Sequence, residues 1–332
     1  MLQNFRFSSW RRTFACALVG LSSLLGVTNS IASDFPSRPI KIVVAFGPGG
    51  MNDLTARELA RRVQSKLGQP VVIENKPGAG QIAAMQAVAG SPADGYTLLF
   101  GSVTGFSLTP HLFKNIPVNP SKFIPVVPIS VTPTVLVTMP DFPANSLTDL
   151  VKYAKGRSTG LNYASTGVGA SAHIAMAVYA KATGINANHI PYKGDITALT
   201  AVRSREVDVA ALSLFAALPR IKSGELKAIG IFQDLPARSL PKVQIPSQAG
   251  VPDASIPSWI GLFAPPNTPT DVVHKLETAT RAVISLPEFQ QFLTERGSEP
   301  LDMDNKGFSE YISRISTRAG KAIRNLNLQP NE

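Results

Sequence analysis

The sequence predicts an α/β protein of two domains, each built on a parallel sheet. Apolar runs of strand length alternate with segments of helical period along most of the chain, which is typical of βαβ units. The 332 residues, 44% of them hydrophobic and 16% charged, suffice for roughly two domains with a sizeable core. Two proline-rich stretches interrupt the alternation and predict two crossings between domains, with a hinged cleft where the domains meet. We place domain 1 at residues 33–131 plus 252–332 and domain 2 at residues 132–251.

The first 32 residues are predicted to be a signal peptide. Arg6, Arg11 and Arg12 form a basic start. Residues 14–27 follow as an apolar stretch that is too short for a comfortable membrane span. The small residues of Ser30–Ala32 then suit a cleavage site. An N-terminal anchor is the alternative, and both the Sec and the twin-arginine export routes stay open.

Export would remove the only cysteine and change the net charge. Cys16 lies inside the predicted signal peptide, so the mature chain would have no disulfide and no thiolate nucleophile or metal ligand. The chain has 32 basic and 22 acidic residues, and losing three Arg and no acid leaves a net charge of about +7. The basic residues are scattered, so we expect no nucleic-acid binding but a weak preference for anionic ligands.

The first part of domain 1 is predicted to hold three strands with two helices between them. Residues 41–46 form a buried, β-branched strand, and Asn52 or Asp53 can cap the helix that follows. Gly68 ends this helix. The remaining elements are strand 71–74, helix 82–89, a turn at 92–95 and strand 96–101.

Prolines recur between residues 117 and 143. Two runs there, 126–130 and 134–138, have strand-like composition. Proline cannot donate a ladder hydrogen bond, so we expect edge strands or extended crossovers rather than central strands. This stretch is the predicted first link between the domains, and residues 235–257 are the predicted return.

Domain 2 repeats the alternation of strands and helices. Its predicted elements are helix 146–155, strand 160–164, helix 170–183, strand 188–191, helix 197–203, strand 207–212, helix 215–223 and strand 227–232. After the return, strand 258–264 and three helices complete domain 1. The segment Thr268–Asp271 (TPTD) resembles a capping box with Pro269 at the first helical position.

Two glycine-bearing turns each join an apolar strand to a helix. The first is Gly47–Gly50 (GPGG) and the second is Pro77–Gly80 (PGAG). Such turns expose backbone N–H groups at a helix N-terminus, where an anion is stabilised. A plain tight turn is the alternative, but the strand–turn–helix context favours an anion site. We expect Asp53 to cap its helix, with contact to a ligand amine or repulsion of a wrong ligand as alternatives.

A second candidate cradle lies between strand 160–164 and the helix that follows it. Ser165 and Thr166 can donate hydroxyls there, and Gly167 lets a ligand approach the backbone. In the alternative, Ser171 only caps the helix and His173 lies on a packed face.

Two further residues are candidate ligand contacts because of their positions at the ends of predicted strands or in loops. Lys193, in the loop 191–195, is a candidate cation, with a plain exposed lysine as the alternative. Ser102 lies where strand 96–101 ends, at the edge of the sheet on which ligands bind.

No catalytic constellation is evident. The four histidines, His111, His173, His189 and His274, show neither metal-ligand spacing nor a paired partner. The sequence contains no GxSxG elbow, no HExxH and no P-loop motif. We therefore expect no catalytic residue, no metal and no cofactor.

Seven segments, in the same order across the mature chain, carry a family resemblance. They are Phe35–Ile40 (FPSRPI), Phe46–Gly50 with Asp53, Glu74–Gly80 (ENKPGAG), Asp94–Leu99 (DGYTLL), Tyr163–Ser165 (YAS), His189–Gly194 (HIPYKG) and Gly261–Pro265 (GLFAP). With these segments the chain resembles the solute-binding receptors of tripartite tricarboxylate transporters, also called Bug receptors.

The resemblance implies a two-domain periplasmic-binding-protein fold, type II-like, that closes around a small carboxylate. Backbone N–H groups of the first glycine turn and of its partner across the cleft would hold the carboxylate. The implied ligand-binding residues are Phe46, Gly49, Gly50, Met51, Asn52, Asp53, Ser102, Ser165, Thr166, Gly167 and Lys193. The partners would be membrane permease subunits and the location periplasmic. We expect a monomer, because no long exposed apolar helix face is evident.

One loop departs from the family's usual pattern. Pro-Gly-Ala-Gly is commonly followed there by Gly-Asn-Ile-Gly, whereas this chain continues with Gln81–Ala84 (QIAA). Gly47 stands where the family often has a second proline. Bulkier residues after Gly80 would narrow the cleft or alter water placement, so the resemblance does not predict which carboxylate is bound.

Two other functions stay open at this point. An exported hydrolase or isomerase acting on a carboxylate would need a general base, and only Asp53, Asp195, Asp208 or a histidine could serve. A sensory receptor would use the same binding to signal to a membrane kinase instead of feeding a permease.

Overall fold

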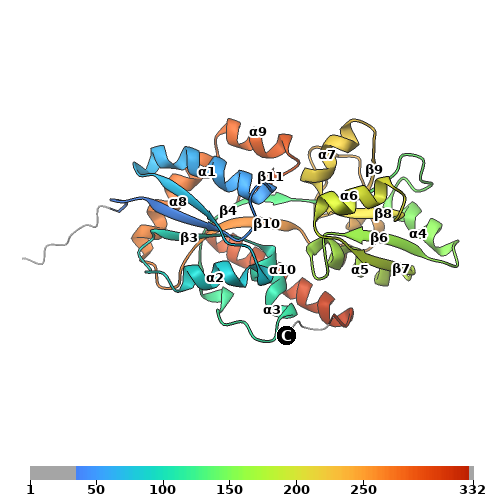
Figure 1. The fold of residues 1–332 in the computed structure, drawn as a ribbon, viewed down its shortest axis with the longest axis horizontal. Helices are drawn as coiled ribbons and strands as arrows, with labels where there is room; N and C mark the ends of the chain where they lie inside the picture. The colour runs from blue at the N-terminus through green and yellow to red at the C-terminus, as the bar shows by residue number, and fades with distance from the viewer. Residues whose placement is uncertain (1–34, 329–332) are drawn as a thin grey trace, which may run out of the picture. The chain divides into compact units, whose positions relative to one another are not determined.

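The computed structural model describes residues 35–328, and Pro36–Glu332 form one compact unit by their contacts (Figure 1). The predicted signal peptide, residues 1–32, lies outside the described residues. Within the described unit the strands form two separate sheets, one of six strands and one of five.

The first sheet has the order β11-β4-β10-β3-β1-β2. Its strands are β1 (Ile40–Val44), β2 (Val71–Asn75), β3 (Thr97–Ser102), β4 (Ile124–Thr132), β10 (Ser258–Ala264) and β11 (Glu299–Pro300). β1 runs parallel to both β2 and β3, as the βαβ pattern predicts, whereas β10 is antiparallel to β3 and β4.

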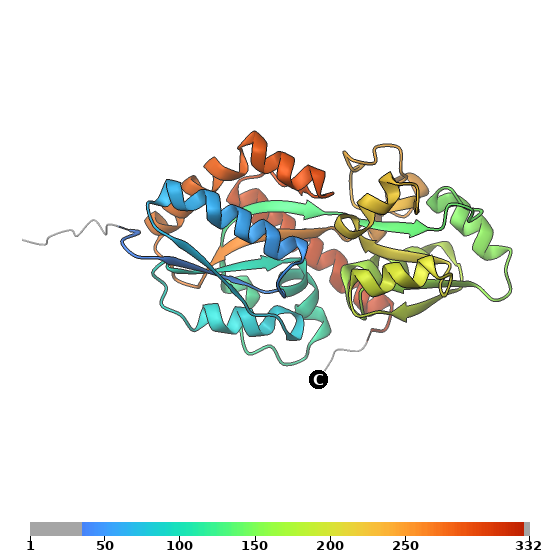
Figure 2. The same cartoon turned by 45° about the horizontal axis from the view of Figure 1, so that its top comes forward.

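Helices α1 (Met51–Leu67) and α2 (Ile82–Ala89) cover opposite faces of the first sheet (Figures 1 and 2). Their connections run in opposite directions, from β1 out to β2 and from β2 back across to β3. Right-handed crossovers in opposite directions put the helices on opposite faces. α1 buries an apolar face that includes Leu59 and Val63, and it ends as predicted at Gly68, which has the left-handed conformation with φ 68°.

The second sheet has the order β7-β6-β8-β5-β9. Its strands are β5 (Thr134–Thr138), β6 (Leu161–Ser165), β7 (Ala187–Pro191), β8 (Val209–Ser213) and β9 (Lys227–Phe232). The helices among them are α4 (Leu147–Lys155), α5 (Ser171–Thr183), α6 (Asp195–Arg203) and α7 (Leu214–Lys222). β6 is parallel to β7 and β8, and α5 and α6 lie on opposite faces, so this sheet repeats the logic of the first (Figure 1).

The chain passes from the first sheet to the second through Pro133, which separates β4 from β5, and returns between β9 and β10. The expectation of edge strands here is wrong for β5, which is paired on both sides along its length. No proline lies within β5, since Pro133 and Pro140 flank it. In β4, Pro125 and Pro128 lie at shifts of the register with β10, where a missing N–H donor is tolerated.

The remaining helices are α3 (Thr109–Leu112), α8 (Thr270–Ile284), α9 (Pro287–Glu295) and α10 (Asn305–Asn325), with a short 3₁₀ turn, η1 (Ala79–Gln81), and a π turn, η2 (Thr104–Leu108). The predicted capping box at α8 is wrong. Pro269 is the N-cap residue, and the Thr268 hydroxyl donates to the Pro265 carbonyl. Along residues 35–328 no helix is long and apolar enough to cross a membrane.

An aromatic cluster fills the core between β10 and α10. The Phe106 and Phe263 rings stack with centroids 4.0 Å apart, and Trp259 meets the Phe308 ring edge-on at 5.3 Å. A Cβ at Gly261 would lie 2.6 Å from the Phe308 ring, so only glycine lets α10 pack this closely on the sheet.

Candidate functional site

Each sheet has a switch point at its carboxyl edge, where neighbouring strands send their connections in opposite directions. In the first sheet β1 leads to β2, whereas the adjacent β3 leads to β4 on the other side. In the second sheet β6 leads to β7, whereas the adjacent β8 leads toward β9. Crevices form at such points and hold ligands in open α/β sheets. The two predicted anion-binding loops, the glycine turn Gly47–Gly50 and the second cradle at Ser165–Gly167, follow β1 and β6 respectively.

The loop between β1 and α1 presents its backbone to solvent. Gly49 and Gly50 are exposed, and a Cβ at either of them or at Gly47 would meet no atom within 4 Å. Gly50 is the N-cap of α1 and provides no side-chain cap, so the N–H groups of Met51 and Asn52 have no partner within the helix. The Met51 side chain is buried, which leaves its backbone as the part that can meet a ligand.

Asp53 organises this loop from beneath. Asp53 is 2% exposed, and its carboxylate accepts hydrogen bonds from Gly49 N at 2.9 Å, Arg57 Nε at 3.0 Å and Asn75 Nδ2 at 2.8 Å. Burial alone would raise the pKa of Asp53, but the hydrogen bonds from Arg57, Gly49 and Asn75 outweigh it and lower the pKa. The prediction that Asn52 or Asp53 caps α1 is wrong, because Gly50 is the N-cap residue with no side-chain cap and Asp53 accepts from Gly49 N, which precedes the helix. The three contacts leave the Asp53 carboxylate engaged within the protein.

Asn75 extends this network to the loop's first residue. Asn75 Nδ2 donates to the Phe46 carbonyl at 3.0 Å, and Asn75 Oδ1 accepts from Arg57 at 2.9 Å. The ends of β1 and β2 and the first turn of α1 are therefore fixed together. Arg57 and Asn75 were not among the predicted site residues, although Arg57 lies one helical turn after Asp53 and Asn75 ends the neighbouring strand.

Ser102 ends β3, beside β1 in the sheet. It is 1% exposed and exchanges two hydrogen bonds with Gln81: Gln81 Nε2 donates to Ser102 Oγ at 2.6 Å, and Ser102 N donates to Gln81 Oε1 at 3.2 Å. The departure at Gln81 thus bears directly on a predicted ligand-binding residue.

The loop between β6 and α5 is the second cradle. Ser165 is fully buried, and its Oγ lies 2.7 Å from His189 Nε2 and 3.3 Å from Gly167 N. Gly167 has φ 133°, and Thr166 is half-buried. Ala170 is the N-cap of α5 and provides no side-chain cap, so Ser171 does not cap this helix as the alternative supposed.

Two stacked histidines lie beneath this loop. The His173 and His189 ring centroids are 3.9 Å apart at an angle of 12°, and His173 Nδ1 accepts a hydrogen bond from Gly169 N at 3.0 Å. Burial, with a smaller contribution from His189, lowers the pKa of His173 to about 4, and burial also lowers the pKa of His189. Both rings are therefore neutral at pH 7.

The expectation that the histidines have no partner is wrong for this pair. His189 lies opposite Tyr163 in the parallel register of β7 on β6, and His173 reaches the same place from α5. Only the strand register, which the sequence does not state, brings them together.

Lys193 lies in a loop attached to the second cradle and is exposed, as the plain-lysine alternative expects. Its neighbour Tyr192 donates from its backbone N–H to the Ser165 carbonyl at 3.0 Å. At the start of α6, Asp195 accepts a hydrogen bond from Ser213 N at 2.9 Å, and burial raises the pKa of this carboxyl. The structure thus brings Ser165, Gly167 and the Lys193 loop together.

A chain of contacts through α3 connects parts of the two sheets. Thr109 Oγ1 donates to the Gly80 carbonyl at 2.7 Å, which attaches the second glycine turn to α3. At the other end of α3, a Cβ at Gly169 would lie 2.9 Å from Leu112 Cδ1. The turn at residues 77–80 is thereby linked to the second cradle through α3.

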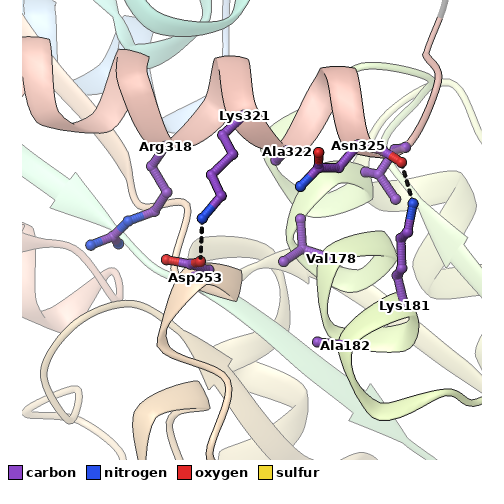
Figure 3. A pocket seen from close by; sticks show the side chains of 9 residues that line it. Val178, Lys181, Ala182, Asp253, Arg318, Lys321, Ala322 and Asn325 are labelled. Atoms are coloured by element: carbon purple, nitrogen blue, oxygen red, sulfur yellow. Dashed lines mark hydrogen bonds and ion pairs between the residues drawn. The ribbon is translucent and has the colours of Figure 1, made fainter.

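A pocket of about 220 Å³ lies elsewhere, between α5 and α10 (Figure 3). Figure 3 shows that two of its cations already have partners: Lys321 pairs with Asp253 at 3.6 Å, and Lys181 donates to the Asn325 carbonyl. None of the predicted ligand-binding residues lines it. Among residues 35–328, no cluster of three His, Cys, Asp or Glu side chains is arranged to hold a metal.

Comparison with known proteins shows the family of the chain. A family model described as the tripartite tricarboxylate transporter family receptor matches residues 55–328. A UPF0065 protein of Bordetella pertussis is 45% identical over 324 residues, which cover 98% of this chain and 99% of that protein.

Solved structures share the fold. One, described as R. palustris Rpa4515 with adipate, has a TM-score of 0.78 at 29% identity. The match covers 90% of this chain and 100% of that chain. The periplasmic binding protein BugD has a TM-score of 0.74 at 30% identity, covering 89% and 99%. MatC from Rhodopseudomonas palustris, with bound malate, has a TM-score of 0.73 at 28% identity, covering 87% and 100%. The fold is thus that of periplasmic binding proteins, and the chain belongs to the tripartite tricarboxylate transporter receptor family.

Proposed function

We propose that this protein captures a small carboxylate between the loop that follows β1 and the loop that follows β6. The observation that carries the proposal is the pair of uncapped helix N-termini, α1 at Gly50 and α5 at Ala170, each behind a glycine turn at a switch point. Free N–H groups and the helix dipole both stabilise an anion there. Each charge-assisted hydrogen bond would contribute about 1.5–3 kcal/mol.

The proposed ligand is a dicarboxylate, in keeping with the adipate and malate bound to two of the similar proteins. Phe46, Gly49–Asp53 and Ser102 would form one side of the site. Ser165–Gly167 and Lys193 would form the other. Domain closure about the crossings at Pro133 and between β9 and β10 would then present the loaded protein to permease subunits.

The remaining parts of the proposal concern the context of the protein. Residues 1–32 act as a cleaved signal peptide that directs it to the periplasm, where it works as a monomer without a cofactor. The two domains are residues 33–131 plus 252–332 and residues 132–251.

Isothermal titration calorimetry of the mature protein against C4–C6 dicarboxylates tests the binding. We expect micromolar or tighter affinity for at least one of them, and a ligand at 100 times Kd should stabilise the fold by about 2.7 kcal/mol. A panel in which no carboxylate binds would refute the proposal.

We further propose that the protein is not an enzyme. The Asp53 carboxylate, a candidate general base, accepts three hydrogen bonds that lower its pKa, so it is poorly suited to take a proton near pH 7. Ligand recovered intact after long incubation is the expected result. Turnover that stops in Asp53→Asn would instead support the hydrolase or isomerase alternative. Capture of a membrane kinase rather than a permease, in the presence of ligand, would support the sensory alternative.

A further inference from the structure

The turn before α2 is held in an unusual backbone conformation. Ala79, Gly80 and Gln81 have φ values of 45°, 60° and 76°, three consecutive residues in the left-handed region. For residues with a side chain this conformation costs about 1–2 kcal/mol each. Such strain persists only where the surroundings enforce it, and it is common at ligand-binding sites.

The side chain of Gln81 shows what this conformation achieves. Gln81 is 3% exposed, packs against Gly105, and is directed at Ser102 rather than at the N–H groups of α2, which it leaves uncapped. Ser102 N can only donate, so the Gln81 atom that it meets at 3.2 Å must be the carbonyl Oε1. The amide orientation is therefore fixed, and Nε2 is the atom that faces Ser102 Oγ at 2.6 Å.

This geometry determines how the Ser102 hydroxyl can act. Ser102 Oγ accepts from Gln81 Nε2 at 2.6 Å and from Thr104 N at 3.2 Å, which uses both of its lone pairs. Its one remaining capacity is to donate its hydrogen. No acceptor for that hydrogen is present among residues 35–328. Ser102 is thus a buried donor at the switch point between β1 and β3 whose natural partner is a group that only accepts.

We infer that Gln81 is a specificity-determining positioning residue, which holds Ser102 as a hydrogen-bond donor and so selects an ionised carboxylate over a carboxamide or an amine. The inference rests on the proposed function, in which Ser102 belongs to the carboxylate site. Gln81 acts through Ser102 and does not itself touch the ligand.

Gln81→Glu tests the inference with almost no change in shape. The introduced carboxylate cannot donate, so the Ser102 hydroxyl turns to donate to it and is lost to the ligand. Calorimetry should show about tenfold or greater weakening for the tightest-binding dicarboxylate and a smaller change for its monoamide. Gln86→Glu, which adds the same charge at an exposed position of α2, is the matched control and should bind like the wild type.

Two further variants separate a role through Ser102 from a merely structural one. In the Ser102→Ala background, Gln81→Glu should add little further loss, because the hydroxyl that it redirects is absent. Gln81→Gly keeps the fold, since glycine accommodates φ 76° without strain, and should lower the carboxylate-over-monoamide ratio of affinities by severalfold because Ser102 can then rotate.

The outcomes are distinct. A wild-type protein that binds dicarboxylates, with both Gln81 variants keeping the wild-type ratio, would overturn the inference and leave the proposed function intact. The inference also fails if Gln81→Glu weakens binding equally with and without the Ser102 hydroxyl. A wild-type protein that binds no carboxylate would overturn both.

Discussion

At the scale of single residues, the stacked histidines beneath the second cradle make stability depend on pH. The pKa of His173, about 4 in the folded protein, is below its unfolded value of about 6.5. The unfolded chain therefore binds the additional proton first, and stability is lost as the pH falls from about 6.5 toward about 4. Between pH 7 and pH 5 this residue should cost about 2 kcal/mol of the free energy of unfolding.

Urea unfolding of the wild type and of His173→Asn at both pH values measures this cost as a difference. The asparagine can still accept a hydrogen bond from Gly169 N and does not titrate. Between pH 7 and pH 5, His173→Asn should therefore lose about 2 kcal/mol less of its free energy of unfolding than the wild type does. Equal losses in the wild type and His173→Asn would contradict the assignment.

The residues that could be predicted from the sequence are those that depend on local geometry. Gly49 and Gly50 were predictable because a glycine turn between a strand and a helix determines its own backbone exposure. The contact between His173 and His189 was not, because it requires β7 to pair with β6 in one particular register and α5 to pack over both. Gln81 was noticed as a departure, but its hydrogen bonds to Ser102 depend on how η1 and β3 meet in space.

At the scale of elements, the hydrophobic periodicity and the residues typical of helix ends located most strands and helices. Apart from the N-cap of α1, the predictions that failed were those that depended on the effect of a proline. Proline was taken to exclude central strands, but β5 places its prolines outside its ends and β4 places them at register shifts. At α8 the motif was recognised correctly as a helix start, but Pro269 occupies the N-cap instead of the first helical position. A proline thus removes one backbone N–H donor, and its effect on a strand depends on whether the neighbouring strand needs a hydrogen bond from that position.

The turn that precedes α1 offers a test at this scale. Gly49 has φ 85°, whereas Gly47 lies outside the left-handed region, and both have open space where a Cβ would go. Gly49→Ala should therefore lower the free energy of unfolding by about 1 kcal/mol through backbone strain alone. It should also weaken dicarboxylate binding, because relaxing the strain shifts the N–H groups of the loop.

Gly47→Ala is the matched control, and we expect it to be neutral or slightly stabilising because it restricts the unfolded chain. Urea unfolding and calorimetry on both variants make the comparison. If Gly47→Ala proved as damaging as Gly49→Ala, added bulk rather than strain would be responsible.

At the scale of the whole molecule, the alternation of strand and helix patterns predicted the α/β class. The proline-rich stretches that interrupt this alternation predicted the passage of the chain between two sheets. The comparisons confirm the fold class, whereas the domain boundaries and the hinge remain predictions. Sequence patterns could not give the strand orders or the antiparallel β10 and β5, because these depend on which distant segments pair. Both predicted cradles nevertheless follow from the parallel units alone, since those units determine where switch points arise.

The aromatic cluster around Trp259 gives the molecule an internal optical probe. The sequence contains only Trp10, in the predicted signal peptide, and Trp259, which is fully buried in β10 of the first sheet. Fluorescence of the mature protein would thus report the first sheet, while far-ultraviolet circular dichroism reports both. Because Pro36–Glu332 form one unit by contact and Pro133 alone separates β4 from β5, we expect the two signals to change at the same urea concentration. A red shift of the emission that precedes the dichroism change would show instead that the sheets melt one after the other.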